Sequence, residues 1–172
     1  MIIQRRIVIQ LVILLAIACP DPFRVAAAST VSNSEPMILG RADVVDGDTL
    51  KIDGIPIRLS GVDAPERKQV CKKKTRQTWS CGKAAADALT REIGVADLAC
   101  RPLDRDRYGR IVALCYRGTI DLSEWLVSRG WAVAFRRYSL DYVASEDAAR
   151  KRRAGIWAGS FEMPWDWRRA HR

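Results

Sequence analysis

Apolar and polar residues alternate along much of the chain after residue 38, which is a pattern typical of β-strands. Two β-branched runs, residues 42–53 and 55–62, are joined by Asp53-Gly54, a dipeptide that favours a two-residue hairpin turn. Three further runs of the same character follow, over residues 97–101, 111–116 and 131–135. The pattern therefore predicts five short strands that begin with a hairpin.

Three other segments carry apolar residues at helical spacing, and each of them ends at a glycine. They cover residues 83–93, 122–129 and 140–154. The second segment follows Asp121, a residue type that favours helix N-termini, and has Glu124 three positions later. A hairpin first and interspersed helices afterwards predict an α+β fold, namely a five-stranded β-barrel of the OB-fold class with about three helices.

The first 28 residues have the pattern of an export signal. Arg5 and Arg6 precede a twelve-residue apolar run, residues 7–18, and Ala26-Ala27-Ala28 offers small residues for cleavage. A helix of that length spans about 18 Å, whereas a bilayer core is about 30 Å thick, so cleavage after Ala28 is favoured over a membrane anchor. Lipidation at Cys19 is the less favoured alternative. We therefore predict a periplasmic or secreted protein.

The remaining chain is long enough for one domain with a hydrophobic core. We predict a flexible lead-in over residues 29–37, a single domain over 38–160 and a C-terminal tail over 161–172. Loss of residues 1–28 removes three arginines and one aspartate, which lowers the formal charge from +9 to +7. Such an excess of positive charge favours polyanionic partners.

Four cysteines follow the export segment, and an even number in an exported domain predicts two disulfides. Three pairings are possible. The sequential pairing, Cys71 with Cys81 and Cys100 with Cys115, closes the shortest loops and is the one that we predict. A zinc site is disfavoured because no C-x-x-C spacing occurs and the only histidine is His171, near the end of the chain.

Charged residues that could carry chemistry fall into four clusters. These are Asp46-Gly47-Asp48-Thr49, Arg58, Asp63-Ala64-Pro65-Glu66 and Asp106-Arg107-Tyr108-Gly109-Arg110. Carboxylates without histidine or thiolate partners favour calcium or magnesium over zinc. A cation and two guanidinium groups can neutralise a phosphoryl transition state, while a glutamate takes a proton from water. Each cluster alone is compatible with an ordinary turn, but together they indicate phosphodiester chemistry.

The order and spacing of these clusters resemble the thermonuclease (staphylococcal nuclease-like) family, from residue 38 to residue 157. The resemblance implies a calcium-dependent endonuclease that hydrolyses DNA and RNA and leaves 3′-phosphate ends. It implies that Asp48 and Asp63 are calcium ligands and that the Ala64 main-chain carbonyl completes the ligand set. It implies that Asp46 does not bind the metal directly but lies next to these ligands. The family has threonine at the position of Ala64, a difference that spares the carbonyl.

The same resemblance assigns the remaining roles. It implies that Glu66 is the general base and that Arg58 and Arg110 bind the phosphate. Candidate substrate-binding residues are Arg107, Tyr108 and Tyr138. We expect a monomer that acts on DNA and RNA, preferably single-stranded, with no obligate protein partner.

Two other functions remain open from the sequence. One is a non-catalytic OB-fold protein of the cell envelope that binds nucleic acid without cutting it. The other is an envelope protein stabilised by its disulfides. The presence of every acid and arginine named above favours the nuclease.

The predicted hairpin raises a geometric question. A turn at residues 53–54 places Asp48 opposite Leu59, so strict alternation would send Asp48 and Arg58 to opposite faces of the sheet. A bulge or strand end is therefore predicted, at either Gly47 or Gly61.

Overall fold

The computed structural model describes residues 36–171. The predicted signal peptide over residues 1–28, the alternative lipidation at Cys19 and most of the predicted lead-in lie outside the described residues. Across the described part of the chain, no helix is both long and apolar enough to span a bilayer.

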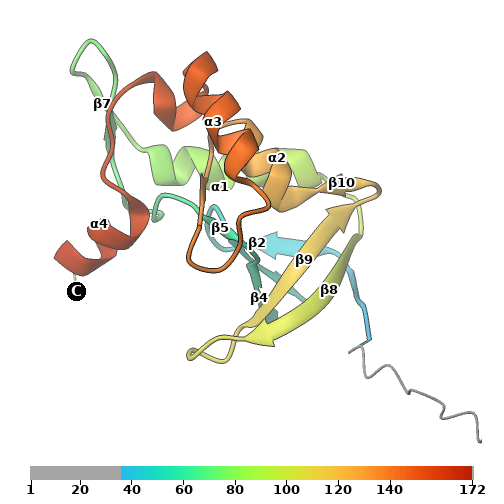
Figure 1. Ribbon diagram of the computed structural model, residues 1–172. Coiled ribbons are helices and arrows are strands. Elements are labelled where there is room, and N and C mark those ends of the chain that lie inside the picture. Colours follow the sequence, from blue (N-terminus) through green and yellow to red (C-terminus); the bar gives the residue numbers. More distant parts are fainter. Residues whose placement is uncertain (1–35, 172) are drawn as a thin grey trace, which may run out of the picture. The chain divides into compact units, whose positions relative to one another are not determined.

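A mixed sheet of seven strands forms the main layer of the fold (Figure 1). The strands run in the order β1-β8-β9-β4-β3-β2, and the short β10 pairs with β9. Only β4 and β9 pair in parallel among these neighbours, because the chain crosses over through α1 and β8 before it returns. The bounds are β1 Ile38–Gly40, β2 Ala42–Val44, β3 Thr49–Ile52, β4 Ile55–Leu59, β8 Leu98–Arg105, β9 Ile111–Arg117 and β10 Ile120–Asp121.

The sheet curls into a half-barrel, which confirms the predicted α+β fold of the OB type. The strand boundaries differ from the prediction at two long runs. The run over 42–53 is divided into β2 and β3, and the run over 55–62 is divided into β4 and the short β5, Val62–Asp63. The predicted strand over 131–135 shortens to β11, Val133–Ala134, which pairs with β5 outside the main sheet.

The core lies between the concave face of the sheet and the helices. Burial alternates along β9, where Ile111, Ala113 and Cys115 point inward. The largest fully buried core side chains include Leu50, Ile52, Ile57, Leu59, Leu89, Leu98, Leu122 and Leu126. Burial of each such leucine or isoleucine is worth roughly 1.5–3 kcal/mol relative to exposure, so this cluster stabilises the half-barrel that positions the site.

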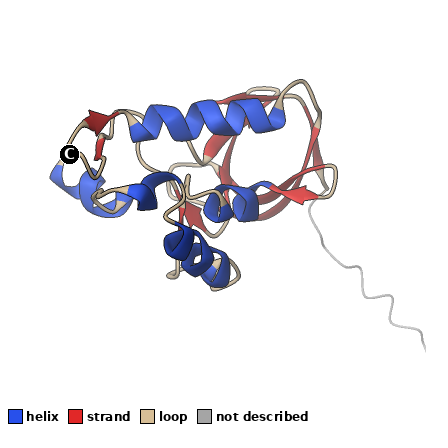
Figure 2. Cartoon of the chain, turned by 90° about the horizontal axis from the view of Figure 1, so that it is seen from above, coloured by secondary structure: helices blue, strands red, loops and turns tan. Residues whose placement is uncertain are grey.

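The helices gather on one side of the curled sheet (Figure 2). Their bounds are α1 Cys81–Ile93, α2 Leu122–Ser128, α3 Val143–Arg152, a 3₁₀ turn at Gly155–Ala158 and α4 Pro164–Ala170. The predicted cap of α2 is present, because the Asp121 carboxylate accepts hydrogen bonds from Ser123 N at 2.8 Å and Glu124 N at 3.2 Å. Helix α4 lies in the predicted tail, where no helix was expected.

Both predicted disulfides are confirmed. Cys100 and Cys115 are directly opposite each other in the β8–β9 pair, so their bridge links adjacent strands. Cys71 lies in β6, Cys71–Lys72, which forms a hairpin with β7, Thr78–Trp79. Its bridge to Cys81 ties this hairpin to the first residue of α1.

Candidate functional site

The first carboxylate cluster lies in a break between β2 and β3. The Val45 and Asp46 amides both donate to the Thr49 carbonyl, at 2.9 and 3.1 Å, and Asp46 Oδ1 accepts from Asp48 N at 3.1 Å. These bonds close a tight turn that interrupts the β alternation. A Cβ atom on Gly47 would lie 2.6 Å from Ala64 Cβ, so only glycine allows this turn to pack here.

This break answers the geometric question. The register places Thr49 opposite Arg58, and Leu59 N donates to the Asp48 carbonyl at 2.9 Å, as expected for a turn at Asp53-Gly54. Because β3 begins only at Thr49, the Asp48 side chain is free of the sheet alternation and reaches Arg58. The interruption at Gly47 therefore brings Asp48 and Arg58 together.

Asp48 is almost completely buried and is held by three groups. Its Oδ2 accepts from the Ala64 amide at 2.6 Å, and its Oδ1 accepts from the Thr49 hydroxyl at 3.2 Å and from Arg58. Burial raises the pKa of Asp48 well above its ordinary value, and the nearby Arg58 opposes this rise. Asp46 and Asp63 raise this pKa further because they add negative charge.

Asp63 lies on the other side of the same guanidinium. Arg58 Nη2 donates to Asp63 Oδ1 at 2.7 Å, and the Asp63 side chain is fully buried. Pairing of Asp63 with Val133 in the β5–β11 ladder fixes this position. Burial acts to lower the pKa of Arg58, but the charges of Asp48 and Asp63 outweigh it and raise that pKa. Two buried carboxylates therefore share one arginine.

Glu66 lies beside this buried cluster and is more accessible. Its side chain is 27% exposed. The loop that carries it is closed by Gln69. The main-chain amide of Gln69 donates to the Glu66 carbonyl at 2.7 Å, and its side-chain Oε1 accepts from the main-chain amide of Glu66 at 3.1 Å. Glu66 is thus a carboxylate at the edge of the cluster, where a water molecule has access to it.

Arg110 reaches the cluster from the turn between β8 and β9. Its Nε donates to Asp106 Oδ2 at 2.7 Å, and its Nη1 donates to the Thr49 hydroxyl at 3.2 Å. Since Thr49 in turn contacts Asp48, Arg110 borders the site through one side chain. Tyr108 is 69% exposed on this turn, with the guanidinium carbons of Arg107 and Arg110 at 5.1 and 5.6 Å from its ring centroid.

Arg168 is the site residue that the sequence reasoning missed. Located in α4, it donates to both oxygens of Asp63 and, at 2.7 Å, to Glu66 Oε1. The hydrogen bond to Asp63 raises the pKa of Arg168 above its already high ordinary value. The sequence feature that indicates the start of this helix is Pro164 at the first helical position, with Asp166 in the first turn. Seven residues are too few for a helical period to show.

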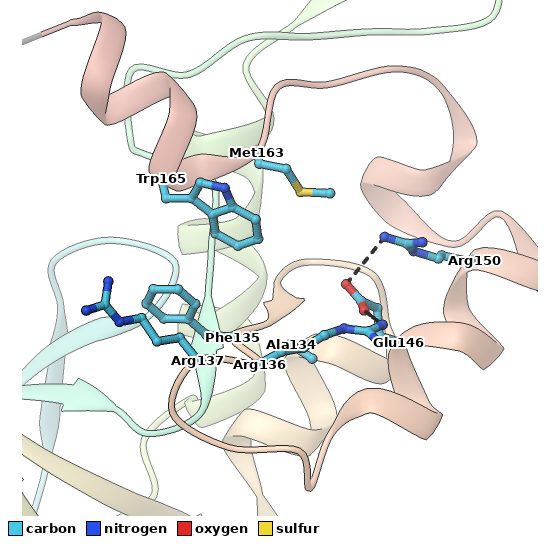
Figure 3. Close-up of a pocket in the computed structure, with 8 residues that line it drawn as sticks. All are labelled: Ala134, Phe135, Arg136, Arg137, Glu146, Arg150, Met163 and Trp165. Carbon is cyan, nitrogen blue, oxygen red and sulfur yellow. Dashed lines mark hydrogen bonds and ion pairs between the residues drawn. The ribbon is translucent and has the colours of Figure 1, made fainter.

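Tyr138 does not join this network. Its side chain is 71% exposed and meets the ring of Phe135 edge-on, with the ring centroids 4.9 Å apart. Phe135 also stacks on Trp165, at 5.5 Å and with 9° between the ring planes. These two rings border a shallow pocket of about 430 Å³ (Figure 3), which is lined by Ala134, Phe135, Arg136, Arg137, Glu146, Arg150, Met163 and Trp165. One of its lining residues, Ala134, lies in β11, which pairs with the strand that carries Asp63.

The donor atoms of the site suit a hard cation. Within residues 36–171, no three Asp, Glu, His or Cys side chains are gathered into a metal-binding group. The candidate donors are the carboxylates of Asp48 and Asp63 and the main-chain carbonyl of Ala64, all in buried residues. The carboxylate oxygens are engaged by Arg58, Arg168, the Thr49 hydroxyl and the Ala64 amide. Such oxygen donors match the preference of calcium or magnesium. Asp46 uses its Oδ1 to hold the turn.

Comparison with known proteins places part of this site in a recognised family, although Asp46, Asp48 and Arg168 lie outside the matched span. The family model described as staphylococcal nuclease homologue matches residues 56–159. This span contains Arg58, Asp63, Glu66 and Arg110, and it ends before α4.

Several curated proteins are similar to this chain, and three of them come from different organisms. The succinoglycan biosynthesis protein ExoI of Rhizobium meliloti (strain 1021) is 39% identical over 123 residues, which cover 70% of this chain and 64% of that protein. The probable staphylococcal-like nuclease CAN2 of Oryza sativa subsp. japonica is 34% identical over 119 residues, or 67% of this chain and 30% of that protein. An uncharacterized endonuclease of Escherichia coli is 29% identical over 133 residues, which cover 73% of this chain and 80% of that protein. The chain thus spans less than two thirds of the first two relatives.

Proposed function

Because this chain belongs to the staphylococcal nuclease family, we propose that it is a nuclease that hydrolyses phosphodiester bonds of nucleic acids. The observation that carries the proposal is the buried Asp48–Arg58–Asp63 cluster beside the accessible carboxylate of Glu66. Relatives named as nucleases or endonucleases support it. The cluster also weighs against a non-catalytic binding protein, since affinity for nucleic acid does not require paired carboxylates to be buried.

We propose calcium as the cofactor, held by Asp48, Asp63 and the Ala64 carbonyl. When bound, a divalent cation supplies Lewis-acid stabilisation of negative charge on phosphoryl oxygens. The two carboxylates are positioned for this role by separate contacts, Asp48 by the Ala64 amide and Asp63 by its place in β5. Their burial favours the cation because few water molecules compete for the same oxygens.

The protein's own side chains perform the proton transfer and bind the phosphate. Glu66 takes a proton from the attacking water, a role that suits an accessible carboxylate at the edge of the cluster. Arg58 and Arg110 donate to the non-bridging phosphate oxygens, where planar guanidinium groups form charge-assisted hydrogen bonds. Both arginines already adjoin Asp48, Arg58 directly and Arg110 through Thr49.

The proposed substrates are DNA and RNA, with single strands preferred, and the proposed products carry 3′-phosphate ends. The positive charge of the chain favours these polyanions. Exposed Tyr108 and Tyr138 offer ring faces to unpaired bases, and Arg107 lies beside Tyr108. An unpaired strand can place its bases on such rings, whereas a duplex keeps its bases stacked. We propose that the protein acts as a monomer.

Removal of calcium tests the proposed activity. We expect the purified protein to cleave single-stranded DNA and RNA in calcium, to lose that cleavage in excess chelator, and to regain it when calcium is restored. Gel analysis of labelled substrates measures this. Binding of the same strands without cleavage at any calcium concentration would instead support the non-catalytic alternative. Full cleavage in chelator would contradict the cofactor while leaving the nuclease intact.

We also propose that the protein is exported and cleaved after Ala28. The two disulfides support this proposal, because such bonds persist in oxidising compartments. The expected mature N-terminus is Ser29, which intact-mass spectrometry of protein isolated from its native cells would detect. A mature chain that begins at a lipidated Cys19 would contradict the cleavage site and indicate a membrane-attached protein.

A further inference from the structure

Arg168 makes a two-pronged contact with the carboxylate that is proposed to bind the cation. Its Nη1 and Nη2 donate to Asp63 Oδ1 and Oδ2, at 2.9 and 2.8 Å. Parallel N–H···O bonds of this kind are among the stronger and more specific hydrogen bonds in proteins. The Asp63 side chain is fully buried and the Arg168 side chain is 33% exposed. Water therefore screens this ion pair less than it screens a pair on the surface.

These bonds engage the oxygen atoms that a cation needs. Asp63 Oδ1 accepts from both Arg58 and Arg168, and Oδ2 accepts from Arg168. A divalent cation coordinates carboxylate lone pairs directly, and a guanidinium charge beside it adds repulsion. Arg58 and Arg168 together leave a cation only one unengaged lone pair of Asp63, at Oδ2, so Arg168 must withdraw before the cation can bind both oxygens.

Arg168 is brought to this position by a packed helix. Trp165, three residues earlier and hence on the same face of α4, stacks on Phe135 (Figure 3). Pro164 is buried at the start of the helix, and the buried Gln69 donates through Nε2 to the Glu162 carbonyl at 2.7 Å. The same Gln69 closes the loop of Glu66, so the segment before α4 and the candidate base share one anchor.

We propose that Arg168 is a positioning residue that competes with the divalent cation for Asp63, so that α4 lowers the metal affinity of the site. The cation displaces Arg168 from Asp63, while the contact between Arg168 and Glu66 orients the general base. This inference rests on the proposed cation site. It adds to that site a residue that regulates metal affinity, and this residue lies outside the span matched by the family model.

A different role for the same arginine predicts a different result. If Arg168 only bound the substrate phosphate, its removal would weaken cleavage and leave the calcium affinity of the free protein unchanged. If Arg168 competes with the cation, its removal strengthens calcium binding without any substrate present. The sign of the change in calcium affinity thus separates the two roles.

The test is isothermal calorimetry of calcium binding to the full chain without nucleic acid. We expect Arg168→Ala to bind calcium at least about tenfold more tightly than the wild type, because one positive charge beside the cation is gone. Arg168→Lys keeps the charge but loses the two-pronged geometry, so its affinity should lie between the two. The matched control is Arg169→Ala, because Arg169 pairs with the exposed Asp166 and should not affect calcium binding.

Trp165→Ala provides a second variant that leaves every site charge in place. Loss of the stack on Phe135 should release α4 and raise calcium affinity in the same direction as Arg168→Ala. Thermal unfolding without metal checks that each variant is folded. Unchanged or weaker calcium binding in the folded variants would overturn the competition while the proposed nuclease stands. If the wild type binds no calcium by calorimetry, the proposed cofactor and this inference are overturned together.

Discussion

Glu66→Gln is expected to lower kcat by roughly 100- to 10,000-fold, the range typical of a lost acid–base group. Glutamine cannot accept the proton of the attacking water at neutral pH. It keeps an oxygen that accepts the hydrogen bond from Arg168. In the described part of the chain the Glu66 side chain forms no hydrogen bond or ion pair with Asp48 or Arg58, so the buried cluster should remain in place. Calcium binding and substrate binding should therefore survive. Single-turnover cleavage of single-stranded DNA, together with calorimetry, measures both properties.

The matched control for this change is Glu92→Gln. Glu92 lies in α1 and pairs with Arg117, away from the proposed site, so kcat should stay within the wild-type range. A rate for Glu66→Gln equal to that of the wild type would remove the general base from the mechanism. Loss of calcium binding in Glu66→Gln would show instead that Glu66 belongs to the metal site.

Arg110→Ala is expected to lower kcat by about 100- to 1,000-fold, as seen when one donor to a developing negative charge is removed. No calcium concentration should restore the rate, because a cation does not replace a charge-assisted hydrogen bond at a different phosphate oxygen. The side chain of Arg110 is 27% exposed, and its ion pair with Asp106 lies near the surface, so the loss in stability should be small. Cleavage measured across a calcium titration tests this expectation.

Arg107→Ala is the neighbouring control for Arg110→Ala. Arg107 lies on the same turn and is exposed, but it approaches the ring of Tyr108 rather than Thr49. We expect it to weaken substrate binding modestly and to leave kcat unchanged. Equal loss of kcat in both variants would mean that the turn contributes only general positive charge.

Several features of the fold followed from residues close together in the chain. Asp53 and Gly54 both adopt positive φ, at 50° and 79°, as the predicted hairpin turn requires. Asp121 caps α2 through its own side chain. Such features depend on backbone preferences within a few residues, so a single sequence contains the information for them. The residue types of the cluster, which are carboxylates and arginines without histidine, could also be predicted from the sequence.

The arrangement of that cluster depended on contacts between distant segments. Alternation along β3 and β4 alone predicted that Asp48 and Arg58 face apart. The turn at Gly47 removes the conflict. It packs against Ala64 of a loop and Ala85 of α1, which leave no room for a side chain at position 47, so a glycine is required there. The sequence offered two glycines for this break. The strands are interrupted at both, but only the turn at Gly47 directly precedes Asp48 and frees its side chain from the sheet alternation.

Helix α4 and its arginine show the limit of local patterns most clearly. Seven residues make too few turns to display a hydrophobic period, and a helix this short is not stable by itself in water. Its stability comes from Trp165 on Phe135 and from the bond between Gln69 and the Glu162 carbonyl. Asp63 and Arg168 are 105 positions apart in the chain, and no spacing rule joins them. They meet because two buried carboxylates with a single shared guanidinium attract a second cationic group, and the folded chain supplies Arg168.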